Sequence, residues 1–508
     1  MSETSIPALL SHLPASTVTV PKINPTNGKK IFDLPQNSAA QVAEAAIRLR
    51  EAQVEWSEWS TRERAEILLT LVDLLLENQD KMLDILQLET GKARGHAYEE
   101  FAGAVGASRY YGKVSPRMLA RKRTRAGIPV VTKSWVEHPA IGLVGVITPW
   151  NYPVALTMLD VLPALAAGNT VLQKADNATP LSVLYCRHLA VEAGLPANAW
   201  QIVVGDGAEV GNAVTDAVDY VAFTGSTATG RRVAERASSR LIGYSLELGG
   251  KNPMIVLPGA NPRKAAKIAI GGAFSSAGQL CVSIERVYVQ RDDIANLEAA
   301  LKAETEALKV GKSGAFDMDM GTLTGAAQLE RVSGFVEDAL AKGAKLVAGG
   351  KRLDAEGPFF YAPTVITEIT EAMNLDRTEV FGPIIQLYPY DDLDEAIDEA
   401  NDTEFGLNAS IVGNEKEALR IASRLQAGSV NINDGFRASF ASMASPMGGM
   451  KHSGKGRRNA EGGLLRFTET RTIGTSVSWF KLPSKASEYG RLAPLMNLLN
   501  KVLKRLPN

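Results

Sequence analysis

The chain has 508 residues, a formal net charge of −1, and hydrophobic and charged fractions of 45% and 22%. These values are ordinary for a soluble globular protein, and they exclude the net basic charge that favours sequence-independent binding to nucleic acid. No apolar run approaches the roughly 20 residues of a membrane span. The composition therefore predicts neither a nucleic-acid partner nor a membrane partner.

The cysteines and histidines predict a reducing compartment. Cys186 and Cys281 are the two cysteines, and they lie too far apart in sequence for a disulfide framework or a paired-cysteine metal site. The five histidines are scattered and form no zinc-ligand cluster. The N-terminal stretch MSETSIPALLSHLPAST lacks the regions of a signal peptide. We therefore expect a cytoplasmic protein with no metal site.

The first hundred residues predict helices. Ser38-x-x-Gln41 and Ser60-x-x-Glu63 both match the capping box that starts a helix. After the second box, apolar residues recur at the helical spacing that gives one buried face, at Ala65, Leu68, Val72 and Leu75.

The segment 121–140 opens with the basic cluster RKRTR, followed by Gly-Ile-Pro and an alternating run. A nucleic-acid patch is one interpretation of this cluster. A solvated hairpin that projects from the body is the preferred one.

From about 141 to 290, short apolar runs alternate with helical segments. The strand candidates are IGLVGVIT, NTVLQ, WQIVVG, DYVAFTG, NPMIVL and RVYVQ. They carry few charges, as expected for strands that are covered on both faces. The alternation predicts parallel α/β sheets, and it resumes from about 320 to 435.

Two glycine-rich turns lie in this region. VVGDGAEVGNAV carries Gly205, Gly207 and Gly211 at a spacing one residue longer than the dinucleotide fingerprint, so we interpret it as a tight turn only. In VAFTGSTATGRR, a strand runs into Gly225 and Ser226 ahead of a predicted helix. Free N–H groups at such a helix start suit a phosphate.

The stretch SSAGQLCVS, residues 275–283, places Cys281 among small polar residues that fit an exposed loop better than a core strand. A reactive thiol there needs a base, a helix terminus or a cofactor charge to activate it. Cys186 lies in a helical pattern and is predicted to be buried. Glu247 ends a short strand and Asn151 follows another, so a thiol, a general base and an amide donor form a candidate trio.

The C-terminal stretch RLAPLMNLLNKVLKRLPN is amphipathic. Its apolar side consists of Leu492, Leu495, Met496, Leu499, Val502 and Leu506. Binding to a membrane surface is one interpretation. Packing against the body or a partner subunit is the preferred one.

Six motifs stand in an order that resembles the aldehyde dehydrogenase superfamily over essentially the whole chain. They are TPWNYP (148–153), FTGS (223–226), LELGGKNP (246–253), GQLC (278–281), EVFGPI (379–384) and PMGGMKHSGKGR (446–457). The resemblance implies an α/β fold with a Rossmann-type cofactor domain at 1–120 and 141–247, and an α/β catalytic domain at 248–460. It also implies a small β oligomerisation arm at 121–140 and 470–482, an amphipathic extension at 483–508, and a homodimer or homotetramer.

The resemblance further implies that a small-molecule aldehyde is oxidised to its acid. In that chemistry Cys281 is the nucleophile that forms a thiohemiacetal and then a thioester, Glu247 activates water, and Asn151 helps to hold the oxyanion. The residues that the family pattern places around the dinucleotide are Trp150, Asn151, Lys174, Ala175, Asp176, Asn177, Gly225, Ser226, Leu248, Glu379 and Phe381.

The choice between NADP and NAD turns on the stretch LQKADNATP. Family members that prefer NAD often carry a glutamate where Asn177 falls, and that charge repels a 2′-phosphate. The position is neutral here and Lys174 lies close by, so we expect NADP to be preferred and NAD to be accepted. Asp176 works against this preference because it restores repulsion.

Several stretches, among them RLIGYSLELGGKNPMIV and SSAGQLCVSIERVYV, are similar to those of bacterial NADP-dependent succinate-semialdehyde dehydrogenases. The expected reaction is therefore succinate semialdehyde to succinate. Better-known members bind the substrate carboxylate with arginines at positions that hold Leu159 and Ser275 here, and Arg437 is either a substitute or a surface charge. The alternatives are a broad-specificity or aromatic aldehyde dehydrogenase and a cofactor-free cysteine hydrolase, which usually pairs cysteine with histidine.

Overall fold

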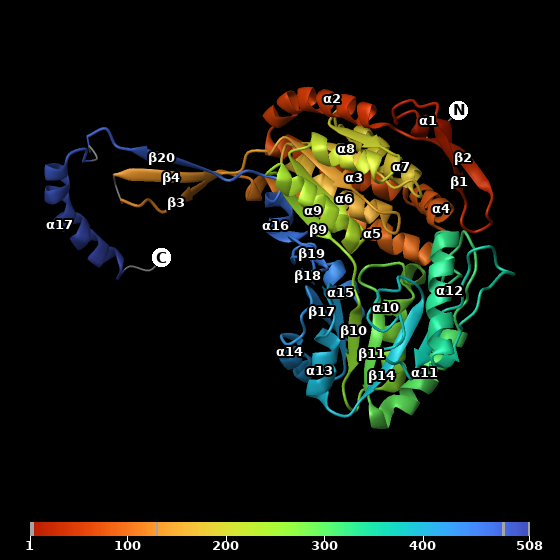
Figure 1. The fold of residues 1–508 in the computed structure, drawn as a ribbon. Helices are drawn as coiled ribbons and strands as arrows, with labels where there is room; N and C mark the ends of the chain where they lie inside the picture. The colour runs from red at the N-terminus through yellow and green to blue at the C-terminus, as the bar shows by residue number, and fades with distance from the viewer. Residues whose placement is uncertain (1–4, 129–130, 480–482, 506–508) are drawn as a thin grey trace. The chain divides into compact units, whose positions relative to one another are not determined.

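The computed structural model describes residues 5–128, 131–479 and 483–505 (Figure 1). They divide into two compact units. Unit 1 is Met1–Leu119 with Ala140–Glu469, and unit 2 is Ala120–Pro139 with Thr470–Asn508.

The first sheet of unit 1 has six strands in the order β19-β9-β8-β5-β6-β7. They are β5 (Leu143–Ile147), β6 (Thr170–Lys174), β7 (Trp200–Val203), β8 (Tyr220–Thr224), β9 (Gly243–Glu247) and β19 (Gly454–Lys455). Strands β5 to β9 are parallel, and β19 pairs antiparallel with β9. The chain runs from β5 to one edge and then returns to β8, so the strand order reverses between β5 and β8. Ligands bind at the carboxyl ends of parallel strands at such a point.

Helices cover both faces of this sheet. One face packs on α2, α8 and α9, and the other on α3 to α7 (Figure 1). Their bounds are α2 (Ala39–Glu58), α3 (Thr61–Glu77), α4 (Gln79–Thr90), α5 (Arg94–Met118), α6 (Pro153–Ala166), α7 (Pro180–Glu192), α8 (Glu209–Ala217) and α9 (Thr227–Ser239). Both predicted capping boxes are confirmed at the starts of α2 and α3. Helix α6 is buried along its whole length, which fixes the segment that follows β5.

The second sheet of unit 1 has the order β12-β13-β14-β11-β10-β16-β17 and is parallel except for β12. Its strands are β10 (Asn252–Val256), β11 (Ile284–Gln290), β12 (Lys345–Ala348), β13 (Thr364–Thr367), β14 (Ile384–Tyr390), β16 (Asn408–Val412) and β17 (Ser429–Ile432). Its helices are α10 (Pro262–Ala273), α11 (Ile294–Glu306), α12 (Ala326–Ala341), α13 (Leu393–Asn401) and α14 (Glu415–Ala422). The predicted α/β alternation is confirmed in both sheets.

Shorter elements complete unit 1. They are α1 (Ile6–Leu10), β1 (Thr19–Ile23), β2 (Lys30–Pro35), η1 (Ser275–Gly278), η2 (Arg291–Asp293), β15 (Phe405–Gly406), α15 (Arg437–Phe440), β18 (Met450–Lys451) and α16 (Ala460–Leu465). Strands β1 and β2 form a hairpin, and β15 pairs with β18. The turn η1 and the loop after it carry Cys281, immediately ahead of β11.

Unit 2 contains a three-stranded antiparallel sheet of β3 (Lys122–Thr124), β4 (Thr132–Glu137) and β20 (Arg471–Ser476), followed by α17 (Ala486–Leu503). The predicted hairpin and the late strand are therefore both present. None of the residues of α17 is buried in the single chain. Residues 480–482 of the predicted arm, and Leu506 with the rest of 506–508, lie outside the described residues.

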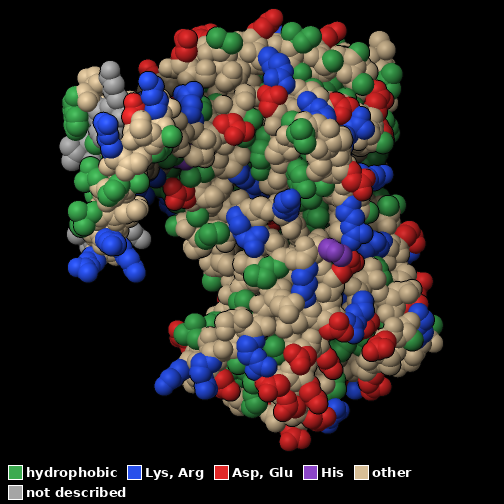
Figure 2. Space-filling model, turned by 60° about the vertical axis from the view of Figure 1, so that its left-hand side comes forward, with side chains coloured by type: hydrophobic (Ala, Val, Ile, Leu, Met, Phe, Trp, Pro, Cys, Tyr) green, Lys and Arg blue, Asp and Glu red, His purple; other side chains and the backbone are tan. Residues whose placement is uncertain are grey.

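The surface carries charges of both signs. On the face shown in Figure 2, Lys and Arg side chains are interspersed with Asp and Glu over the upper part, and acidic side chains gather at the lower end, where α11, α13 and α14 lie in Figure 1. This distribution agrees with the net charge of −1. Within the described ranges, no helix is both long and apolar enough to cross a membrane.

Candidate active site

The loop that carries Cys281 is held tightly at its backbone. Gly278 has a φ of +70°, and a Cβ at this position would stand 2.1 Å from the carbonyl oxygen of Gly382, so only glycine fits. Two amides fasten the residues that follow: Asn151 Nδ2 donates to the carbonyl of Gln279 at 3.0 Å, and Asn252 Nδ2 donates to that of Cys281 at 2.8 Å. Asn151 follows β5 and Asn252 begins β10, so the loop is fastened from both sheets.

The expectation that Cys281 sits on an exposed loop is wrong. Ser275 and Gln279 are 2% and 4% exposed, and Cys281 is itself partly buried. The small polar side chains are satisfied internally, since the Ser275 hydroxyl donates to Glu99 at 2.8 Å. Burial, and then the carboxylates of Glu247 and Glu379, raise the pKa of the Cys281 thiol to about 12. Cys186 is fully buried, as predicted.

Glu247 is the last residue of β9 and is 4% exposed. Burial raises the pKa of this carboxyl to about 7, opposed by the positive charges of Arg458 and Arg466. Its Oε2 atom is buried and has no hydrogen-bond partner among the described residues. An orphaned buried carboxylate oxygen is costly, and it indicates a functional group that acts on a ligand or a water.

A buried charge cluster that the sequence analysis missed lies behind Glu247. Asp160 of α6 accepts from Arg458 Nε at 2.8 Å and also pairs with Arg466. Arg458 is 1% exposed, and its Nη2 group donates both to Asp160 and to the hydroxyl of Thr224 at the end of β8. The pKa of Asp160 lies below its usual value because the two arginines outweigh the burial of the carboxylate. The cluster therefore joins α6, β8 and the segment around α16 beside the carboxylate of Glu247.

A second missed pair positions Asn151. Lys92 and Glu100 form a buried ion pair, and Lys92 Nζ donates to the carbonyl of Asn151 at 2.8 Å. Glu100 accepts from the backbone N–H of Val154 at 2.6 Å, in the first turn of α6. Because Tyr152 supplies no side-chain cap to α6, Glu100 takes that role. Lys92 and Glu100 thus act on the backbone of Asn151 and of the first turn of α6 that follows it.

The residues Glu379 to Phe381 approach the thiol loop from the second sheet. Glu379 accepts from the backbone N–H of Gly250 at 2.8 Å, and burial with the nearby Glu285 raises its pKa to about 7. Glu285 in turn accepts from the backbone N–H groups of Val380 and Phe381 at 2.9 and 3.0 Å. The ring of Phe381 meets that of Trp150 edge-on at 5.7 Å. These contacts connect the predicted residues Glu379, Phe381 and Trp150 to one another near Cys281.

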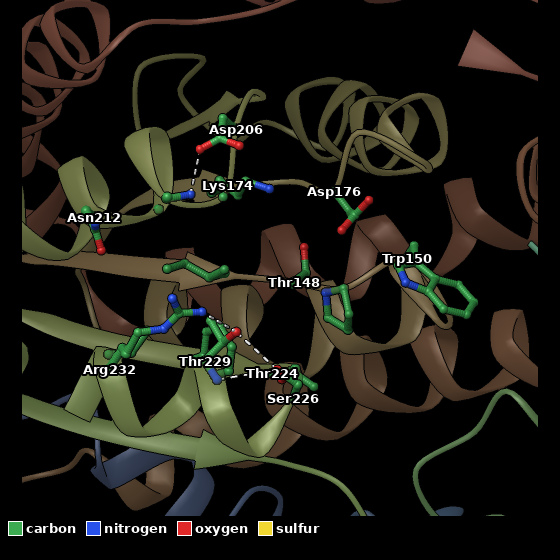
Figure 3. A pocket seen from close by; sticks show the side chains of 18 residues that line it. Thr148, Trp150, Lys174, Asp176, Asp206, Asn212, Thr224, Ser226, Thr229 and Arg232 are labelled. Carbon is green, nitrogen blue, oxygen red and sulfur yellow. Dashed lines mark hydrogen bonds between the residues drawn. The ribbon is translucent and has the colours of Figure 1, made fainter. Parts of the chain in front are cut away.

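A cavity of about 410 Å³ opens at the carboxyl ends of β5, β6 and β8 (Figure 3). Of the residues predicted to bind a dinucleotide, five line it: Trp150, Lys174, Asp176, Gly225 and Ser226. The starts of α8 and α9 form part of its wall, and Ser226 caps α9 by accepting from the N–H of Thr229. The cavity therefore lies at the reversal of strand order, where the sheet topology predicts a ligand.

The other predicted dinucleotide residues do not line this cavity. Ala175 is fully buried, Leu248 packs against Gly230 of α9, and Asn151, Glu379 and Phe381 lie toward the thiol. The side chain of Asn177 is occupied elsewhere: it donates to Gln36 at 2.9 Å and accepts from the N–H of Gly205 at 2.9 Å. The glycine-rich turn at 205–211 is more than a turn, because Gly207 and Gly211 also line the cavity.

The donors in this cavity fit an anionic ligand. Lys174 is 7% exposed, and its side chain makes no hydrogen bond or ion pair within the described part of the chain; in Figure 3 this side chain lies between Asp176 and Asp206. The N-terminus of α9 adds the backbone N–H groups of its first turn, which have no partner within the helix, beside Gly225 and Ser226. A pyrophosphate and a ribose supply the acceptor oxygens that these donors lack. The residues present therefore fit a dinucleotide.

Comparison with known proteins shows the same architecture. The family model described as "Aldehyde dehydrogenase family" matches residues 12–473. A Mycobacterium ulcerans protein named "Putative succinate-semialdehyde dehydrogenase [NADP(+)] 2" is 47% identical over 450 residues, covering 88% of this chain and 87% of its own. The crystal structure of succinate-semialdehyde dehydrogenase from Burkholderia pseudomallei is 33% identical with a TM-score of 0.87, over 91% and 96% of the two chains. An NAD+ complex of an aldehyde dehydrogenase from Bacillus cereus is 32% identical with a TM-score of 0.86, over 91% and 94%.

Proposed function

The chain belongs to the aldehyde dehydrogenase family, and we propose that it oxidises succinate semialdehyde to succinate with NADP as the electron acceptor. The observation that carries the proposal is the convergence of Cys281, Glu247 and Asn151, from three distant parts of the chain, beside a cavity that fits a dinucleotide. The printed names of the similar proteins support the substrate and the cofactor.

In the first half of the reaction, Cys281 Sγ adds to the aldehyde carbon and forms a thiohemiacetal. The thiol proton passes to Glu247, whose pKa of about 7 suits a base at neutral pH. The oxyanion accepts from Asn151 Nδ2 and from the backbone N–H of Cys281. Asn151 Nδ2 carries two hydrogens, and its bond to Gln279 uses one of them, so the second is free for the oxyanion.

NADP+ bound beside Cys281 would supply the hydride acceptor, and the thiohemiacetal held on Cys281 would then become a thioester. Glu247 releases the thiol proton to solvent and then takes a proton from a water molecule, and the hydroxide adds to the thioester carbon. Cleavage of the carbon–sulfur bond releases the acid, and the sulfur of Cys281 takes back a proton from Glu247. The sum is aldehyde, water and NADP+ converted to acid, NADPH and a proton.

The residues proposed to hold NADP form two groups. Lys174, Gly225 and Ser226 line the cavity at the strand ends and suit the adenosine and pyrophosphate portion. Trp150, Glu379 and Phe381 lie toward Cys281 and suit the nicotinamide portion. The predicted roles of Ala175, Asn177 and Leu248 rest on the family pattern.

The proposed partner of the far carboxylate of succinate semialdehyde is Arg437. Glu99 pairs with Arg437 Nε at 2.6 Å and accepts from Ser275, which stands six residues before Cys281. The Nη1 group lies over Gly271, where a Cβ would stand only 3.1 Å away. Because Glu99 contacts Nε, the two terminal amino groups remain available for a bidentate carboxylate. Arg437 also borders a surface depression lined by Arg263, Lys264, Lys267, Ile268 and Asp434, where the cations outnumber the one carboxylate and therefore attract anions.

Replacing Arg437 by leucine is expected to raise KM for succinate semialdehyde by about 10- to 100-fold, because a charge-assisted hydrogen bond is worth about 1.5–3 kcal/mol. The KM for propanal, which has no carboxylate, should change less than about twofold. Steady-state kinetics with both aldehydes measures this. Arg420→Leu, on the exposed side of α14, is the matched control. An equal change for both aldehydes would reject the carboxylate contact.

The proposed function is tested by kcat/KM for succinate semialdehyde, propanal and benzaldehyde with NADP and with NAD. We expect succinate semialdehyde with NADP to exceed every other pair by about tenfold or more, a difference of about 1.4 kcal/mol. Equal turnover of the three aldehydes would favour a broad-specificity enzyme. A preference for NAD would reject the cofactor assignment, and acid release from a thioester without any aldehyde oxidation would indicate a cysteine hydrolase.

A further inference from the structure

We propose that Arg232 binds the 2′-phosphate that distinguishes NADP from NAD, and that this arginine sets the cofactor preference of the protein. The inference rests on the proposed function, since it concerns the dinucleotide assigned to the cavity. In the sequence, Arg232 stands out in no way, because its charge is one of several in the helix α9.

Arg232 lies in the second turn of α9 and lines the cavity. Figure 3 shows it on one side of the cavity, with Asn212 of α8 on the other and Lys174 at the end of β6 beyond them. The space between α8 and α9 is open, because no atom lies within 4 Å of where a Cβ at Gly207 or Gly211 would stand. A ligand that enters between these helices therefore passes Arg232.

The other arginines of α9 have anionic or ring partners, whereas Arg232 does not. Arg231 pairs with Glu404 at 3.6 Å and contacts the ring nitrogen of His452 at 3.1 Å. Arg236 donates to Asp216 at 2.6 Å. Within the described residues, the side chain of Arg232 makes one hydrogen bond, a long one of 3.3 Å to the Thr229 hydroxyl, and no ion pair. Its guanidinium is thus directed to the cavity with most of its donors unused.

The charges that line the cavity balance only when Arg232 is counted. Lys174 and Arg232 face two carboxylates, Asp176 and Asp206. Each carboxylate gives one oxygen to backbone N–H groups, Asp176 to Ala178 at 2.9 Å and Asp206 to Ala208 at 2.8 Å, and both remain anionic neighbours. Without Arg232 one cation would face two anions, a setting that repels a phosphate dianion.

NAD carries a neutral 2′-hydroxyl where NADP carries the phosphate, so binding of this part of NAD does not depend on the charge balance. Lys174 alone can donate to ribose hydroxyls. The structure therefore assigns different tasks to the two cations: Lys174 serves either dinucleotide, and Arg232 serves the one with the additional phosphate. This division explains how NADP can be favoured although neither Asp176 nor the amide of Asn177, which is already hydrogen-bonded, provides a donor for the 2′-phosphate.

The test is the Kd of NADP and of NAD for the full-length apoprotein, measured by isothermal titration calorimetry, which needs no turnover. Arg232→Gln should raise the Kd of NADP by about tenfold or more and change that of NAD by less than about twofold, because a charge-assisted phosphate contact is lost. Arg231→Gln, one residue away on the same helix, should leave both values within about twofold. The probe pair 2′,5′-ADP and ADP should repeat the pattern.

An unchanged Kd of NADP in Arg232→Gln, or an equal loss for NAD, would overturn the inference. Arg232→Lys keeps the charge and should retain part of the NADP affinity, which separates loss of the contact from damage to the fold. Failure of the proposed function looks different. Wild-type protein that binds NAD more tightly than NADP would reject the cofactor assignment. The ratio of the Kd of NADP in Arg232→Gln to that in wild type would still test the role of Arg232.

Discussion

Replacing Cys281 by serine is expected to lower kcat for aldehyde oxidation by about 10⁴-fold or more, the scale of loss when a covalent nucleophile is removed. The site already raises the pKa of the thiol to about 12, through burial and the carboxylates of Glu247 and Glu379. A hydroxyl is a far weaker acid than a thiol, so a base with a pKa of about 7 cannot activate it usefully. Formation of NADPH with succinate semialdehyde measures the loss.

The matched control is Cys186→Ser in the buried face of α7. This change places a hydroxyl in an apolar environment, so we expect a lower melting temperature and an unchanged kcat per folded molecule. Alkylation by iodoacetamide should label Cys281 before Cys186, because Cys281 is only partly buried. A Cys281→Ser variant that keeps its kcat within about tenfold of wild type would refute the nucleophile assignment.

Replacing Glu247 by glutamine is expected to lower steady-state kcat by about 10²- to 10⁴-fold, the usual contribution of a general base. The carboxyl must be ionised to accept a proton, and burial raises its pKa to about 7. Activity of the wild type should therefore rise as pH increases through about 7 and level off above it. The glutamine variant should lose this inflection, because an amide does not titrate there.

Glu379 also has a pKa of about 7, so the inflection alone does not identify Glu247. Glu379→Gln is the discriminating variant, and it should keep the inflection while its cofactor KM changes. Rapid mixing should show whether NADPH still forms in a first turnover of Glu247→Gln before the slow release of acid. If the inflection survives in Glu247→Gln and disappears in Glu379→Gln, the base has been assigned to the wrong carboxylate.

Local sequence patterns predicted much of the fold. The buried parallel strands read as short apolar runs, and both capping boxes mark helix starts, because these signals depend on neighbours within a few residues. Glu247 was expected at a strand end, and it lies there. The resemblance supplied the chemistry: the roles of Cys281, Glu247 and Asn151 remain predictions that the variants above test.

The parts that sequence did not predict depend on pairs far apart in the chain. Arg458 and Asp160 are separated by 298 positions, and Lys92 and Asn151 by 59, so no periodicity links them. The polar flanks of Cys281 suggested exposure because composition does not show that Glu99 satisfies Ser275 inside the protein. Spacing also led to a wrong interpretation of the turn at 205–211, because Gly207 and Gly211 line the cavity although the turn does not match the fingerprint.

The link between Asp160 and Arg458 has a consequence for synthesis of the chain on the ribosome. The carboxylate of Asp160 belongs to a helix with no exposed side, yet its cationic partner emerges 298 residues later. The first sheet is likewise incomplete at one edge until β19, residues 454–455, has been synthesised. Nascent chains shorter than about nine-tenths of the full length would bury an unneutralised carboxylate, which is costly. The first sheet and α6 should therefore reach their final packing only when translation is nearly finished. Until then, we expect chaperones to bind the incompletely folded chain.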